Sequence, residues 1–183
     1  MSTRTQATIK DLSRVPENGK AEIVDGEILI MPPTGEDPGR ASGSVYISLR
    51  RYERQSRGGR AVPDNVGFIV DLPNRRSFSP DAAFHFNAPA GMKFVDGSPV
   101  FAVEVRSDED YGPAADRKIA EKRADYFAAG TLVVWDVDLL SDEVVKSFSA
   151  SDPEHPRIFR RGEIADAEPA LPGWRMPVDE LFT

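Results

Sequence analysis

A single glutamate interrupts an apolar stretch at residues 100–105, which read Val-Phe-Ala-Val-Glu-Val. Such a run is typical of a strand buried on both faces of a sheet. An ionised carboxylate there costs on the order of several kcal/mol unless a cation or hydrogen-bond donors meet it. Glu104 therefore predicts an interior strand with a compensating group beside it.

A second acidic residue, Asp81, lies in the strand-like run of residues 79–86. Because side chains alternate along a strand, Asp81 and His85 share one face, as do Glu104 and Arg106 on the other strand. If the two strands are neighbours, their carboxylates can hold one Mg²⁺ or Mn²⁺ together with water. His85 lies two strand steps, ~13 Å, from Asp81 and is expected to be partly exposed. The chain has no cysteine and two histidines, so oxygen ligands are expected.

A lysine occupies the predicted core-facing side of a helix. Residues 114–129 are predicted to form this helix, which ends at Gly130. The residues expected to face the core recur every three or four positions and are Ala115, Ile119, Lys122, Tyr126 and Ala129. Lys122 alone is readily interpreted as a side chain that extends to water. Beside two carboxylates, it would orient a water nucleophile and stabilise phosphorane-like charge.

Each acid also has a purely structural interpretation. Asp81 alone would be a turn or cap residue after Pro80, and Glu104 alone would pair with Arg106 or a nearby lysine. Their occurrence together with Lys122 favours a metal site.

The remaining pattern predicts a mixed β-sheet flanked by helices, in the α/β (α+β) class. Asp25-Gly26 predicts a hairpin between two four-residue strands. The other predicted elements are a short helix at 9–14, a helix at 38–57, strands at 60–62, 66–71 and 132–137, a loop at 87–98 and a terminal hairpin at 143–148 and 157–160. Residues 1–183 are expected to form one domain, with a core at about 20–150 and a tail anchored by Trp174, Leu181 and Phe182. Trp135 and Trp174 are expected in the core.

Composition limits the partners and the compartment. The net charge of -7 argues against a protein that simply coats nucleic acid. It does not exclude a nuclease, which needs only a local basic rim. No run of eighteen apolar residues occurs, and residues 1–6 lack a hydrophobic signal core, so the expected compartment is the cytoplasm without a membrane anchor.

Several short stretches, taken in order, resemble the Uma family of restriction endonucleases within the PD-(D/E)xK nuclease superfamily. They are residues 21–28, 31–33, 79–84, 103–107 and 122–130, followed by Trp135. The similarity spans roughly residues 22–137. It implies a restriction-endonuclease-like core with an N-terminal β-hairpin, and Asp81 and Glu104 as ligands of Mg²⁺ or Mn²⁺. Lys122 would take the catalytic cation role that many superfamily members place two residues after the second acid.

Two further residues are candidates for accessory roles. Glu22 matches an acidic family position, so the resemblance implies that it assists the metal. Arg106 departs from the family pattern at its position and would neutralise Glu104 or replace a lysine. The implied function is hydrolysis of DNA phosphodiester bonds by a metal-dependent endonuclease. Cleavage of both strands leads us to expect a two-fold homodimer. The alternative is a catalytically silent binding or regulatory module, because fold alone does not decide function.

Overall fold

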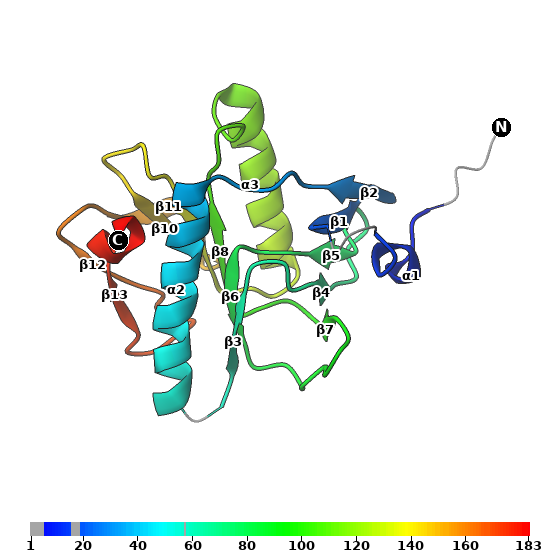
Figure 1. Ribbon diagram of the computed structural model, residues 1–183, viewed down its shortest axis with the longest axis horizontal. Helices are drawn as coiled ribbons and strands as arrows, with labels where there is room; N and C mark the ends of the chain where they lie inside the picture. The colour runs from blue at the N-terminus through cyan, green and yellow to red at the C-terminus, as the bar shows by residue number, and fades with distance from the viewer. Residues whose placement is uncertain (1–5, 16–18, 57) are drawn as a thin grey trace.

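A six-stranded mixed sheet forms the centre of the protein (Figure 1). This computed structural model describes residues 6–15, 19–56 and 58–183. The strand order is β11-β10-β9-β8-β6-β3, with β8 and β9 parallel and the other neighbours antiparallel. The strands are β3 (Arg60–Pro63), β6 (Ala82–His85), β8 (Phe101–Val105), β9 (Val133–Val137), β10 (Val145–Ser149) and β11 (Asp152–Phe159). The predicted mixed sheet flanked by helices is therefore confirmed.

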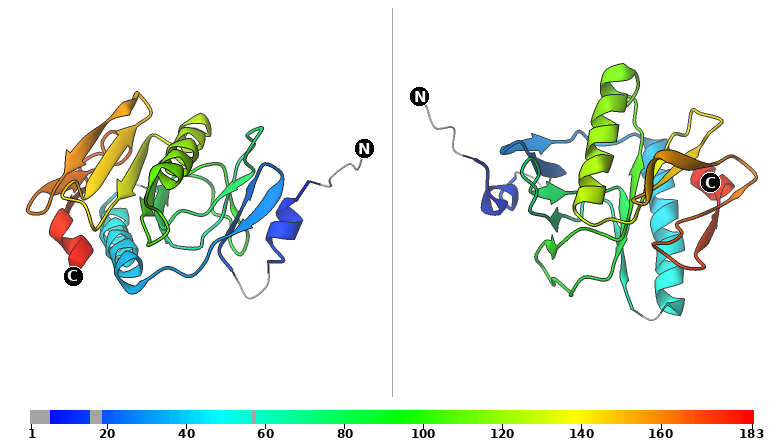
Figure 2. Two further views of the ribbon diagram at one scale, coloured as in Figure 1. Left: turned by 90° about the horizontal axis from the view of Figure 1, so that it is seen from above. Right: turned by 180° about the vertical axis from the view of Figure 1, so that it is seen from behind.

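Two long helices cover opposite faces of this sheet (Figure 2). The first, α2 (Glu36–Gln55), buries a stripe that includes Val45 and Leu49 against one face. The second, α3 (Pro113–Ala128), packs Tyr126 against the other face. Pro113 lies in the first turn, where backbone N–H groups have no partner within the helix, and proline lacks an N–H; proline is therefore favourable at the start of a helix. Each face of the sheet therefore has its own apolar layer.

The N-terminal hairpin has the predicted boundaries, β1 (Ala21–Val24) and β2 (Glu27–Ile30). Its two turn residues, Asp25 and Gly26, have φ angles of 50° and 76°. Positive φ at both positions is what a tight two-residue hairpin turn requires. A short helix, α1 (Ile9–Leu12), precedes the hairpin and packs against β1.

A small second sheet, in the order β5-β4-β7, corrects three sequence predictions. The predicted strand 66–71 pairs only over β4 (Phe68–Ile69), because its neighbours β5 (Ser77–Phe78) and β7 (Val95–Asp96) are equally short. The predicted strand 79–86 is shortened to β6 (Ala82–His85), which begins two residues after Pro80, a residue with no N–H for a ladder. The predicted loop 87–98 contains β7.

The C-terminal segment packs on the α2 side of the sheet through β12 (Ile164–Asp166), β13 (Arg175–Pro177) and the 3₁₀ helix η2 (Val178–Phe182). Trp174 lies 5.1 Å from Trp135 between ring centroids and donates to Ser48 Oγ at 3.1 Å. Trp174 and Leu181 are buried, and Phe182 packs against the same cluster. The predicted anchors and the core location of both tryptophans are confirmed.

Among the residues described, none of the helices is long and apolar enough to cross a membrane. Residues 1–5, which contributed to the expectation of no signal core, lie outside the described residues, as does residue 57 of the predicted helix 38–57. The cytoplasmic compartment and the single domain spanning 1–183 stay predictions.

Candidate active site

Antiparallel pairing of β6 and β8 brings the two predicted acids together. Ala82 pairs with Val103, so one further step in the register places Asp81 opposite Glu104. The Asp81 N–H donates to the Val103 carbonyl at 3.0 Å, which holds this step. Residues directly opposite in an antiparallel pair project to the same face of the sheet. The predicted adjacency of the two strands is confirmed.

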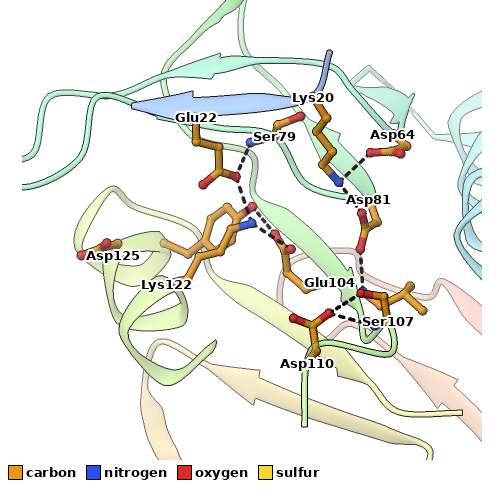
Figure 3. A network of polar contacts seen from close by, with 12 residues as sticks. Lys20, Glu22, Asp64, Ser79, Asp81, Glu104, Ser107, Asp110, Lys122 and Asp125 are labelled. Carbon is orange, nitrogen blue, oxygen red and sulfur yellow. Dashed lines mark hydrogen bonds and ion pairs between the residues drawn. The ribbon is translucent and has the colours of Figure 1, made fainter. Parts of the chain in front are cut away.

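Lys122 of α3 points at the same face, as its helical position predicts (Figure 3). Its Nζ lies 2.9 Å from Glu104 Oε2 and 2.9 Å from Glu22 Oε1. One turn further along the helix, the Tyr126 hydroxyl donates to Glu104 Oε1 at 2.6 Å. Both oxygens of Glu104 are therefore bound by α3, while the catalytic role of Lys122 stays a prediction.

Glu22 joins the hairpin to this cluster from β1. Its side chain is 2% exposed, and its Oε1 accepts from the Ser79 backbone N–H at 2.9 Å as well as from Lys122. Arg75 donates to the other oxygen and also pairs with Asp125 of α3 at 2.8 Å. Glu22 is therefore in contact with two cationic side chains, Lys122 and Arg75. Its predicted metal-assisting role is untested.

Asp81 is held by a residue that the sequence patterns did not single out. Its Oδ2 accepts from the Val105 N–H at 2.7 Å, and Lys20 donates to its Oδ1. Lys20 also lies 2.7 Å from Asp64 Oδ1. A signal was present in the sequence, since Lys20 and Glu22 alternate with the buried Ala21 and therefore share a face of the hairpin.

Arg106 does not donate to Glu104 in the structure but to the next strand. Its guanidinium makes two 2.8 Å hydrogen bonds to Asp136 of β9 and a third to Asp116. Asp136 on β9 lies opposite Glu104 on the parallel strand β8. Its buried carboxylate is therefore on the same face of the sheet as Arg106 and within its reach. The Glu104–Arg106 pair that we considered is replaced by this contact, and an accessory role stays a prediction.

Comparison with known proteins agrees with the sequence resemblance. The family model Uma2, described as "Putative restriction endonuclease", matches residues 9–179. The chain belongs to this family. A crystal structure of "a putative nuclease belonging to DUF820" from Anabaena variabilis ATCC 29413 superposes with a TM-score of 0.72 at 15% identity, covering 96% of this chain and 97% of that one. This likeness shows a shared fold. No curated protein gave a significant match.

The charges of this Uma2-family site shift one another's pKa values. Burial raises the pKa of Glu104, and the negative charges of Asp81 and Glu22 add to this, while Lys122 opposes it. Although burial works in the other direction, Lys122 and Arg75 lower the pKa of Glu22. Likewise, Glu104 and Glu22 raise the pKa of Lys122 against its burial. The pKa of Glu104 is therefore raised although Lys122 contacts its carboxylate.

The donor set suits a hard divalent ion. The described residues contain no group of three or more acidic or histidine side chains already arranged around a metal position. Asp81 and Glu104 nevertheless offer oxygen ligands from facing positions, and Mg²⁺ binds through one or two carboxylates with water completing its shell. Burial, together with the charges of Asp81 and Glu22, raises the pKa of Glu104 and so disfavours its charged form.

His85 takes no part in this cluster. It is 2% exposed, in contrast to the partly exposed position predicted, because both sides of β6 are covered. Its ring lies edge-on to Phe68, with 5.6 Å between the centroids. Burial lowers the pKa of His85, so a packed, neutral imidazole stands where a partly exposed side chain was expected.

Proposed function

We propose that this Uma2-family chain is a metal-dependent endonuclease that hydrolyses DNA phosphodiester bonds with Mg²⁺ or Mn²⁺. The observation that supports this most directly is the placement of Asp81 opposite Glu104, with the Lys122 ammonium 2.9 Å from the Glu104 carboxylate. Family membership and the nuclease-like fold agree with this chemistry. Under the proposal, Asp81 and Glu104 are the metal ligands and Lys122 is the catalytic cation.

The divalent ion, Lys122 and Glu22 would have separate roles in the reaction. When bound, the divalent ion supplies Lewis-acid polarisation and lowers the pKa of water at the site. Lys122 would orient the water nucleophile and stabilise negative charge that develops on the phosphate oxygens. Glu22 would keep the Lys122 ammonium at the edge of the cluster, because it is buried and also anchored by Arg75. Since Lys122 stays protonated well above neutral pH, it would act through its charge rather than as a base.

The test combines a plasmid-nicking assay with calorimetric titration of MgCl₂ and MnCl₂. Asp81→Ala and Glu104→Ala should each abolish both cleavage and ion binding, because such sites depend on few carboxylates. Lys122→Ala should retain ion binding and lose turnover, since the lysine acts in the transition state. Lys118→Ala, on the exposed side of the same helix, is the matched control and should cleave like the wild type. Equal residual cleavage in the three site variants would contradict the proposal.

The second candidate is a non-catalytic binding or regulatory module. It is favoured by one observation: Lys20 and Lys122 already neutralise the acid pair from two sides, so the site is balanced without a metal ion. A wild-type protein that binds neither Mg²⁺ nor Mn²⁺ in the titration would favour this candidate. Binding of DNA without cleavage in either ion would do the same.

The proposal includes a homodimer, because nucleases that cut both strands of a duplex usually present one active site to each strand. Sedimentation velocity with and without a short DNA duplex measures this directly. Double-strand cleavage by a protein that stays monomeric on DNA would refute the dimer while leaving the chemistry intact.

A further inference from the structure

Lys20 occupies the side of the acid pair opposite to Lys122 (Figure 3). It directly precedes β1, its side chain is 17% exposed, and its ammonium contacts both Asp81 and Asp64. The charges of Asp81 and Glu104 both act on this ammonium. Lys20 is therefore part of the acid cluster and not a surface lysine beside it.

The two oxygens of Asp81 are not equally available. Oδ2 is held by the Val105 backbone N–H at 2.7 Å, a contact that the pairing of β6 and β8 maintains. Oδ1 is held only by the flexible side chain of Lys20 among the contacts of the described residues. A cation bridging Asp81 and Glu104 would therefore use Oδ1, the oxygen that Lys20 occupies.

Asp64 provides Lys20 with a second partner at the same place. Its Oδ1 lies 2.7 Å from Nζ, and its side chain is 40% exposed, so solvent reaches it more easily than Asp81. A lysine ammonium has three donors on a flexible stem and can rotate between two such carboxylates. Lys20 can thus leave Asp81 without leaving its own charge unpaired.

We propose that Lys20 is the built-in counter-ion of Asp81, which competes with a divalent cation for Oδ1 and moves to Asp64 when the cation binds. This inference rests on the proposed function, because it takes Asp81 and Glu104 as the ligand pair. Like charges a few ångströms apart repel, so the ammonium and the divalent ion exclude each other from Oδ1. Lys20 then keeps the acid pair in place without metal and limits the affinity of the site.

The test measures divalent-ion affinity and metal-free stability in the same variants, and neither readout requires cleavage. Lys20→Met should bind Mn²⁺ and Mg²⁺ at least about tenfold more tightly than the wild type, a shift of roughly 1.4 kcal/mol. The same variant should melt at a lower temperature without metal, because Asp81 then faces Glu104 without its counter-ion. Lys20→Arg keeps the charge and should retain the wild-type affinity. Lys118→Met should change neither quantity.

A double-mutant cycle with Asp64→Asn isolates the movement of Lys20. In the wild-type background this change should weaken Mn²⁺ binding several-fold, because Lys20 loses its alternative partner. In the Lys20→Met background the effect should largely disappear. An equal effect in both backgrounds would overturn the proposed transfer to Asp64.

The outcomes also separate this inference from the proposed function. If the wild type binds the ion and Lys20→Met binds it equally or less tightly, the inference about Lys20 fails and the metal site stands. Binding by Lys20→Met alone would support the inference in its strongest form. If neither protein binds a divalent ion, both proposals are refuted. Should Lys20→Met not fold, Lys20→Gln is measured in its place.

Discussion

Replacing Glu22 by glutamine measures how much the buried charge network stabilises the fold. Glu22 is 1% exposed and accepts from Lys122, Arg75 and the Ser79 N–H. Glutamine has nearly the same shape, but its amide keeps one acceptor oxygen and turns an NH₂ group toward cationic donors. Removing one partner from a buried ion pair typically costs about 3–5 kcal/mol. Because the amide oxygen keeps part of the hydrogen bonding, we expect a loss of about 3 kcal/mol at neutral pH.

The loss should depend on pH with a definite sign. The pKa of Glu22 is lowered in the folded protein, so its stabilisation is present above the ordinary glutamate value of 4.5. That stabilisation disappears as the pH falls through the lower, folded-state pKa. The difference between wild type and Glu22→Gln should therefore be full at neutral pH and shrink on acidification below 4.5.

Urea and thermal unfolding, monitored by circular dichroism, provide the measurement. A loss of about 3 kcal/mol corresponds to a melting temperature about 6–12 °C lower for a chain of this length. Glu121→Gln is the matched control on the exposed face of α3 and should stay within about 0.5 kcal/mol of the wild type. If Glu22→Gln is no less stable than this control, or if its loss does not change on acidification, the assigned network is wrong.

Three further changes probe the surroundings of the site. Glu104→Gln should leave stability unchanged or raise it by up to about 1 kcal/mol at neutral pH. The reason is that the raised pKa of Glu104 makes its ionised form destabilise the fold above pH 4.5. Urea unfolding at two pH values checks this. Arg106→Met should lower the free energy of unfolding by about 3 kcal/mol, since Asp136 is 5% exposed and loses its two-bond partner, while calorimetry should show that ion affinity is retained. Trp174→Ala should destabilise by about 3–5 kcal/mol with unchanged ion affinity, because it packs on the α2 side of the sheet; a normal melting curve or a changed affinity would contradict this.

Local and periodic signals predicted the parts of the molecule that depend on nearby residues. The hairpin follows from Asp25-Gly26, whose positive φ angles are a local requirement. The approach of Asp81 to Glu104 follows from strand alternation, and the orientation of Lys122 follows from helical spacing. Each of these predictions needs only the geometry of one element and the adjacency of two strands.

The remaining contacts depend on tertiary pairing that no local pattern contains. Lys20 meets Asp81 across 61 residues, and its side chain alone could equally have pointed to water. Arg106 was expected near Glu104 because both share a face, yet the parallel strand β9 presents Asp136 at the same level. The two-residue strands of the small sheet are too short to show alternation. The predicted partial exposure of His85 was wrong because β6 is covered on both sides.

The spread of the acid cluster along the chain governs when it can form during synthesis. Glu22 accepts from the backbone N–H of Ser79, which lies 57 residues later in the chain. Lys122, which pairs with Glu22, is synthesised later still. Contacts this distant have to overcome loop-closure entropy before they contribute any stability. A growing chain that ends before α3 therefore leaves Glu22 and Glu104 without the lysine that neutralises them. Translation products that end before α3 therefore lack an assembled acid–lysine cluster.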